Sequence, residues 1–272
     1  MTIAERVQQY MIERRARVCA PTRVGPFTVL LHSTDEAIES NLAIPVAPLS
    51  MTPEQSWREA LRAAFASRGR VPAIQWIVEL VPHLASTLQA MGFSERQRET
   101  LMVCTSQTRP RSPAPVAGLT FIAITEASPL DETRENLDIN EFGFDPAAAK
   151  PATDEQAARF RDTLAAGRAF TARLDGHPAS AGMYTTPLAG VTELVGITTL
   201  EQYRGRGIAA ALTAHMASAA FAQGCDLAFL TTANLAARRA YEHAGFQLAG
   251  DVVTYVPSTP GVRQESAGDV PL

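Results

Sequence analysis

Residues 203–212, YRGRGIAAAL, place two glycines and two arginines directly before a run of alanine and leucine. Glycine allows unusual backbone dihedral angles and close backbone approach, so Gly205 and Gly207 predict a tight turn. A helix that starts at such a turn presents unpaired N–H groups and the positive end of its dipole, and Arg204 and Arg206 add positive charge. The stretch therefore predicts a site for an anion such as phosphate.

The elements around this turn predict where the anion site lies in the fold. A strand over 191–200 precedes it, and a helix to about 222, a strand at 225–232 and a helix at 234–244 follow it. This βαβα order predicts a parallel or mixed sheet, with the turn at the carboxyl end of a strand, where open α/β sheets bind ligands. The nucleotide-binding patterns GxGxxG and GxxxxGK[ST] are both missing from the turn.

Two motifs in this region resemble those of the GNAT superfamily of acyl-CoA-dependent N-acyltransferases. The pyrophosphate-binding pattern R/Q-x-x-G-x-G/A falls on Arg204, Gly207 and Ala209. The second pattern, N-x-x-A-x-x-x-Y-x-x-x-G-F, is met by Asn234, Ala237, Tyr241, Gly245 and Phe246. Both occur in the expected strand–helix–strand–helix context, and residues 116–256 have the length and element order of one whole domain of this kind.

The resemblance implies an α/β fold with a mixed, splayed β-sheet flanked by helices, the acyl-CoA N-acyltransferase fold, in two related lobes. It implies acetyl-CoA as cosubstrate, no metal, and an N-acetyltransferase that moves an acetyl group to a primary amine by direct attack in a ternary complex. In such proteins the pantetheine arm lies between two splayed strands and pairs with the main chain of the first. The implied cofactor-binding residues are Ile197, Thr198, Thr199, Arg204, Gly205, Arg206, Gly207, Ile208, Ala209, Ala210 and Asn234.

One departure and one alternative qualify these binding residues. Thr199–Leu200–Glu201 stands where many relatives have valine and proline, which leaves the bulge geometry of this strand in doubt. Asn234 matches a position near the pantetheine or thioester, and it fits a helix N-cap equally well.

The resemblance also implies two catalytic residues, Tyr241 and Glu193. Tyr241 matches a tyrosine that protonates the departing thiolate, although a tyrosine on an amphipathic helix also suits the core. Glu193 lies where some relatives place a glutamate that deprotonates the amine through water, and an ordinary strand-end carboxylate is the alternative. Glu135, Asp138 and Glu141 lie where relatives build the acceptor site, or are simply solvated.

The chain order predicts a degenerate N-terminal lobe over 1–110, a linker at 111–117, a catalytic domain over 118–257 and a C-terminal tail at 258–272. A helix, Gly-Phe and a strand occur near residue 92 and again near 245, which indicates a repeated pattern. We expect a helix over about 2–18, ended by Pro21, and a loop over 34–52. Asp175–Gly176 predicts a hairpin turn.

The composition narrows the class of protein. The 272 residues are 46% hydrophobic and 19% charged with a net charge of −4, which is typical of a globular protein and argues against general binding to nucleic acid or membrane. The three scattered cysteines predict buried thiols and a cytoplasmic location. We expect a small-molecule or peptide amine as acceptor, with a homodimer left open. The alternatives are a non-catalytic acyl-CoA-binding or regulatory module and a scaffold protein.

Overall fold

The computed structural model describes residues 1–46, 55–108, 110, 114–164 and 168–258. They form two compact units: unit 1 contains Met1–Arg14 and Glu99–Val252, and unit 2 contains Arg15–Arg98 and the residues from Val253 onward. The units therefore do not follow two consecutive stretches of sequence. The predicted domain boundaries stay a prediction, and residues 111–113 of the linker and 259–272 of the tail lie outside the described residues.

Unit 1 carries the glycine turn and both sequence motifs. The elements wholly or partly in it are α1 (Ile3–Ala16), β5 (Phe93–Thr105), β6 (Leu119–Ile124), α4 (Leu130–Phe144), α5 (Asp154–Thr163), β7 (Ala169–Leu174), β8 (His177–Tyr184), β9 (Val191–Thr199), the 3-10 helix η3 (Glu201–Tyr203), α6 (Ile208–Ala222), β10 (Leu227–Thr232), α7 (Leu235–His243) and β11 (Gln247–Pro257).

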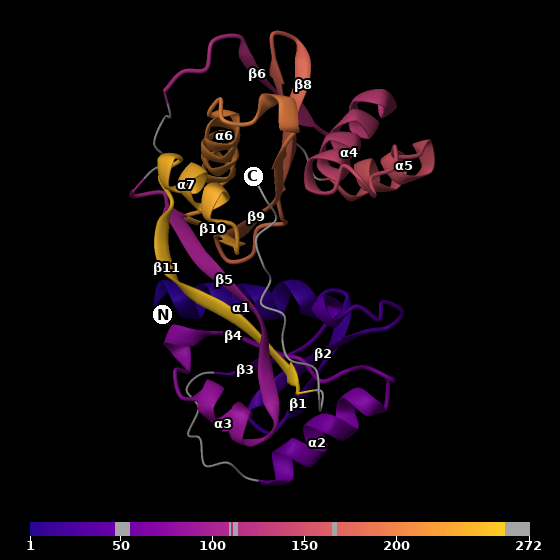
Figure 1. Cartoon of the computed structure of the whole chain (residues 1–272), viewed down its shortest axis with the longest axis vertical. Helices are drawn as coiled ribbons and strands as arrows, with labels where there is room; N and C mark the ends of the chain where they lie inside the picture. The colour runs from indigo at the N-terminus through magenta and orange to yellow at the C-terminus, as the bar shows by residue number, and fades with distance from the viewer. Residues whose placement is uncertain (47–54, 109, 111–113, 165–167, 259–272) are drawn as a thin grey trace. The chain divides into compact units, whose positions relative to one another are not determined.

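The strands of unit 1 are ordered β11-β5-β10-β9-β8-β7-β6. Strands β9 and β10 are parallel, whereas β6 to β9 form an antiparallel meander and β5 runs antiparallel to β10. Helices α6 and α7 lie on one side of β8 and β9, and α4 and α5 lie on the other (Figure 1). This confirms the predicted mixed α/β sheet flanked by helices.

The main core of unit 1 lies between the sheet and α6. Helix α6 is apolar on almost every side because it packs against β8, β9 and α7, and Leu212 and Met216 are fully buried in it. Sheet residues such as Phe170 and Leu230 complete this cluster. On the opposite face a smaller cluster joins Leu164, after α5, to β6 and β7.

The hairpin turn predicted at Asp175–Gly176 is present in the structure. Asp175 and Gly176 join β7 to β8 with φ of 51° and 82°, the positive values that a type I′ turn requires at both central positions. Such a turn matches the right-handed twist of the strands and sets their pairing.

Unit 2 repeats part of this pattern. Its elements are β1 (Cys19–Val24), β2 (Phe27–His32), the 3-10 helix η1 (Ile38–Ser40), β3 (Asn41–Pro45), α2 (Gln55–Ala66), β4 (Ile74–Ile77), the 3-10 helix η2 (Val78–Leu80), α3 (Leu84–Ala90) and parts of β5 and β11. Strands β2 and β3 are antiparallel and β3 and β4 parallel, as β8, β9 and β10 are in unit 1. This arrangement supports two related lobes.

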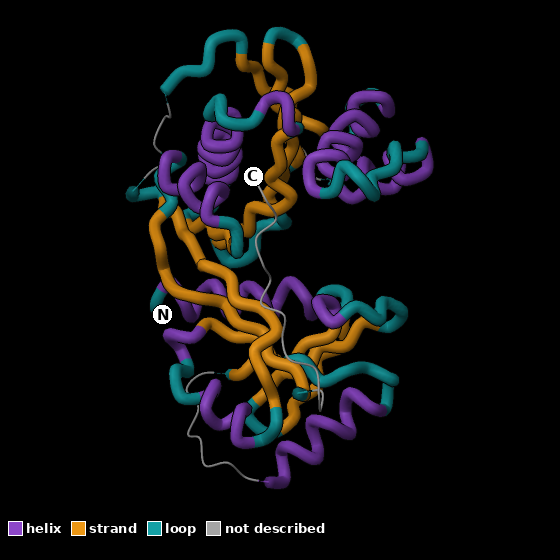
Figure 2. The backbone as a smooth tube through the Cα atoms, in the orientation of Figure 1, coloured by secondary structure: helices purple, strands orange, loops and turns teal. Residues whose placement is uncertain are grey.

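The two longest strands, β5 and β11, each lie next to a strand from the other half of the chain. In unit 1, β5 from the N-terminal half pairs with β10, and in unit 2, β11 from the C-terminal half lies next to β4. Figure 2 shows β5 and β11 side by side. The set of strands in each unit therefore includes a strand from the other half of the sequence.

Two sequence-based expectations were wrong. Residues 34–52 were expected to be a loop, but Asn41–Pro45 form β3, whose five residues are all buried. Pro21 was expected only to end a helix, but it lies within β1, which is the edge strand of the sheet. An edge strand tolerates proline because an N–H on its outer side has no partner strand to bond. In both cases pairing with β2 overrides the local effect of proline.

Candidate functional site

The glycine turn adopts the backbone conformation that its sequence predicted. Gly205 and Gly207 have φ of 74° and 79°, in the left-handed region that favours glycine. Gly207 is the N-cap of α6 and no side chain caps this helix. Ile208 and Ala210 are buried and Ala209 is half-buried, and the first N–H groups of α6 have no partner within the helix itself.

The two arginines of the turn are placed differently. Arg204 donates from Nε to the carbonyl of Thr199 at 3.1 Å and from an Nη atom to the carbonyl of Gly143 at 2.9 Å. Its guanidinium thus joins the turn to the ends of β9 and α4. Arg206 is exposed and lies over the ring of Tyr203, 5.7 Å from the ring centroid.

This difference yields a prediction for the pair Arg204→Lys and Arg206→Lys. An ammonium group cannot reach two carbonyls as the planar guanidinium does, so Arg204→Lys is expected to lower the free energy of unfolding by about 1–2 kcal/mol. Arg206→Lys is expected to change it by less than about 0.5 kcal/mol, as for surface substitutions generally. Urea unfolding of both variants measures the difference, and equal stabilities would contradict the role assigned to Arg204.

Strands β9 and β10 separate beside this turn. They pair in parallel only at Leu227↔Val191, Ala228↔Thr192 and Phe229↔Glu193. Beyond Glu193, β9 continues its pairing with β8. The carboxyl-terminal half of β9 therefore presents one backbone edge to the gap, which is the splay that the resemblance implied.

A β-bulge shapes β9 within this splayed half. The register with β8 shifts between Ala181↔Thr198 and Met183↔Val195, and Gly196 has a φ of 64°. A left-handed glycine at the first bulge position is one of the common bulge types. The departure from the relatives' valine and proline at 199–201 thus does not prevent a bulge.

Helix α4 holds the bulge through Asn140. Its side-chain amide donates to the carbonyl of Gly196 at 2.6 Å. A Cβ atom at residue 196 would stand 2.9 Å from the Asn140 amide nitrogen, so a side chain there would displace this amide, and the positive φ favours glycine. Sequence reasoning missed Asn140, because its partner lies 56 positions along the chain.

The predicted main-chain contacts lie along the splayed half of β9. The N–H of Leu200 donates to the carbonyl of Ala179 on β8 at 3.0 Å. Since successive N–H groups of a strand point to opposite edges, the N–H of Thr199 is directed toward the gap. Thr198 and Thr199 are buried and Ile197 is half-buried, and the predicted binding of a cofactor by their main chain stays a prediction.

Asn234 caps helix α7. Its Oδ1 atom accepts from the N–H groups of Ala236 at 2.8 Å and Ala237 at 3.1 Å. The N-cap alternative for this residue is therefore present in the structure. The cap uses the carbonyl oxygen of the side chain, and the role of Asn234 toward a cofactor stays a prediction.

Tyr241 lies in α7 and is buried in the main core of unit 1, with 7% of its surface exposed. Burial raises the pKa of its phenol to about 12. The group is therefore protonated throughout the physiological pH range and is suited to donate a proton rather than accept one.

Glu193 lies at the last paired position of β9 before the splay. Its Oε2 atom accepts from an Nη atom of Arg14 on α1 at 2.9 Å, and 19% of the side chain is exposed. The sequence analysis did not anticipate Arg14, which no motif marks and which lies 179 positions from its partner.

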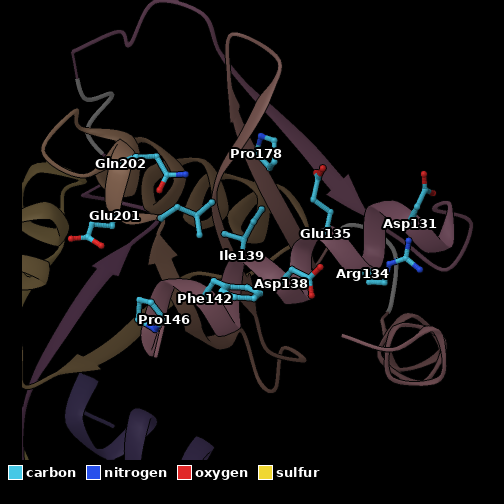
Figure 3. Close-up of a pocket in the computed structure, with 11 residues that line it drawn as sticks. Asp131, Arg134, Glu135, Asp138, Ile139, Phe142, Pro146, Pro178, Glu201 and Gln202 are labelled. Atoms are coloured by element: carbon cyan, nitrogen blue, oxygen red, sulfur yellow. The ribbon is translucent and has the colours of Figure 1, made fainter. Parts of the chain in front are cut away.

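An acidic pocket of about 600 Å³ lies along α4. Its carboxylates are Asp131, Glu135, Asp138 and Glu201, drawn in Figure 3 with the apolar side chains Ile139 and Phe142. Glu135 forms an ion pair with Arg173 at 2.6 Å, and Asp138 accepts from the N–H of Ala152 at 2.6 Å. The structure thus brings two of the three predicted acceptor carboxylates to one pocket, while Glu141 is exposed and does not line it.

Other chemistries find less support in unit 1. Burial, followed by the charge of Asp226, raises the pKa of the Cys225 thiol to about 11, which makes it a poor nucleophile at neutral pH. No group of three or more His, Cys, Asp or Glu within the described ranges could hold a metal ion. No helix built from the described residues is long and apolar enough to cross a membrane.

Comparison with known proteins agrees with this geometry. The model of the acetyltransferase (GNAT) family matches residues 133–246. The chain is similar to a GCN5-related N-acetyltransferase from Kribbella flavida, with 25% identity, coverage of 96% of this chain and 97% of that chain, and a TM-score of 0.77. No curated protein has a significantly similar sequence.

Two further solved structures share the fold at lower identity. A GCN5-related N-acetyltransferase from Sphaerobacter thermophilus has 16% identity and a TM-score of 0.58, with coverage of 86% of this chain and 78% of its own. A tandem GNAT protein from the clavulanic acid biosynthesis pathway has 16% identity and a TM-score of 0.56, with coverage of 84% and 77%. The latter is consistent with the predicted tandem architecture.

Proposed function

We propose that this protein transfers an acetyl group from acetyl-CoA to a primary amine, because residues 133–246 match the model of the acetyltransferase (GNAT) family. The observation that carries the proposal is the uncapped, glycine-led start of α6 beside the point where β9 and β10 separate. This combination offers one site for a pyrophosphate and an adjoining strand edge for an extended chain.

The glycine turn fits the pyrophosphate. Gly205 has open space where a Cβ atom would stand, and at Gly207 the nearest atom would be 3.7 Å away on Val116. The N–H groups of Ile208, Ala209 and Ala210 would bind the phosphate oxygens, as helix N-termini do. Arg206 would add a charge-assisted contact from the surface, while Arg204 holds the turn in place.

The splayed half of β9 fits the pantetheine arm. The main chain of Ile197, Thr198 and Thr199 would pair with its amides as a neighbouring strand does. Bound there, acetyl-CoA supplies the acetyl group as an activated thioester. The N–H of Thr199, directed toward the gap, would donate to the thioester oxygen as negative charge develops on it.

Glu193 and Tyr241 would move the protons. Glu193 takes a proton from the amine, directly or through water, so that nitrogen presents a lone pair to the acetyl carbon. Tyr241, protonated because its pKa is raised to about 12, gives its proton to the departing sulfur. The attack occurs directly in a ternary complex, without an acyl-enzyme.

The acceptor is a small-molecule or peptide amine. Where it reaches the acidic pocket beside α4, carboxylates such as Asp131 and Glu201 favour a cationic group. Glu135 and Asp138 hold protein partners already, and they shape the pocket wall.

The burial of Tyr241 is the observation that favours a second candidate, a non-catalytic acyl-CoA-binding or regulatory module. A tyrosine packed in a hydrophobic core needs no catalytic role to be explained. Under this alternative acetyl-CoA binds but no amine is acetylated. Tyr241→Phe then leaves the affinity for acetyl-CoA unchanged.

Isothermal titration of acetyl-CoA, followed by thiol release assays on a panel of amines, tests the proposal. We expect micromolar binding, and a thermal shift that grows with ligand, since a ligand at 100 times its Kd stabilises the folded state by about 2.7 kcal/mol. Binding without turnover on any amine favours the regulatory module. No binding to the folded protein would overturn both and favour a scaffold.

A further inference from the structure

The N-terminal helix α1 lies across the strands that splay. Arg6, Tyr10 and Arg14 are four residues apart and therefore share one face of this helix. Arg6 donates to both carboxylate oxygens of Asp226, just before β10, at 2.6 and 2.8 Å. Tyr10 packs edge-to-face on Phe229 of β10, with ring centroids 5.4 Å apart.

Arg14, the last of the three, reaches the point at which the strands part. Its partner Glu193 stands opposite Phe229 in the last parallel pair of β9 and β10. Leu194, the next residue of β9, packs in the cluster around α6, so Glu193 points to the opposite face of the sheet. Arg14 thus contacts the carboxylate on the face away from the glycine turn.

We propose that Arg14 is a positioning residue for Glu193, holding its carboxylate charged and oriented at the start of the splay. The inference rests on the proposed function, in which Glu193 accepts the proton of the amine. The hydrogen bond of 2.9 Å from Arg14 fixes the orientation of one carboxylate oxygen of Glu193. A guanidinium remains charged at every working pH, so this contact favours the ionised form of its partner throughout.

Two titratable groups of α1, Arg14 and Tyr10, interact with Glu193. Burial raises the pKa of Tyr10, which also responds to the charges of Arg14 and Glu193. Thr185, just after β8, contacts the backbone of Glu193, and Phe229 of β10 lies opposite Glu193; both residues are uncharged. Arg14 is therefore a positive charge in direct contact with this carboxylate.

The test compares Arg14→Gln, Arg14→Lys and Arg6→Gln. In wild type and each variant, NMR of the side-chain carboxyl carbon gives the titration midpoint of Glu193, and kcat/KM against pH gives the midpoint of its acidic limb. Arg14→Gln is expected to raise both midpoints by about half a pH unit, the size typical of a partly exposed ion pair. Arg14→Lys keeps the positive charge, so both midpoints should lie close to their wild-type values.

Arg6→Gln is the matched control, because it breaks an ion pair on the same helix face without touching Glu193. It should leave both midpoints at their wild-type values. The inference is overturned if Arg14→Gln leaves the NMR midpoint of Glu193 unchanged. It is also overturned if Arg6→Gln moves that midpoint equally, because Arg14 would then act only by holding α1 against the sheet.

The two measurements separate this inference from the proposed function. An NMR shift with no turnover on any amine keeps the Arg14–Glu193 coupling and rejects catalysis. Turnover whose acidic limb is unchanged by Arg14→Gln rejects the inference and keeps catalysis. In the background of Glu193→Gln, Arg14→Gln should have no further effect on kcat/KM, and an undiminished effect there would also overturn it.

Discussion

Gly207→Glu is expected to abolish acetyl-CoA binding, raising Kd by at least about 100-fold. Gly207 is the N-cap of α6 with a φ of 79°. A glutamate there places a negative charge where the helix dipole and the free N–H groups would meet the pyrophosphate. Isothermal titration of the folded variant measures the loss.

Two control variants separate charge from backbone strain. Gly207→Ala carries the strain of a side chain at positive φ, and among the described residues its Cβ atom meets only Val116, at 3.7 Å, so binding should weaken far less than with glutamate. Gly176→Glu puts the same charge at a φ of 82° in the open β7–β8 turn, and should bind acetyl-CoA as wild type does. Wild-type affinity in Gly207→Glu would place the anion site elsewhere.

Tyr241→Phe is expected to lower kcat by about 100-fold or more while the Kd for acetyl-CoA stays within about threefold. Removing the hydroxyl takes away a proton donor but leaves the buried ring in place. Because burial raises the pKa of Tyr241 to about 12, the phenol stays protonated below pH 9, and the loss should be nearly constant between pH 6 and 9.

Tyr184→Phe is the matched control for this prediction. Tyr184 belongs to the same buried cluster, and burial likewise raises its pKa to about 12. Its hydroxyl is buried and finds no hydrogen-bond partner among the described residues, so its removal should leave kcat unchanged and stability equal or higher. Equal losses in both variants would mean that Tyr241 serves only the core.

The sequence by itself determined the features that depend on neighbouring residues. Glycines at 205, 207 and 176 have the positive φ that their turns require, because only local steric effects decide this. The order of strands and helices around 191–257 follows from apolar patterning and predicted the mixed sheet. The two spaced motifs indicated the GNAT family, and the model of that family matches residues 133–246, which contain both motifs.

Only the tertiary structure decided which distant groups meet. Arg204 belongs to the pyrophosphate-binding sequence pattern, yet its hydrogen bonds to Thr199 and Gly143 depend on how α4 crosses the sheet. Strand β3 was missed because proline-rich flanks indicated a loop, while pairing with β2 and β4 buries it. Arg14 reaches Glu193 because α1 packs on a sheet built from the other end of the chain, and nothing in the local sequence records such a contact.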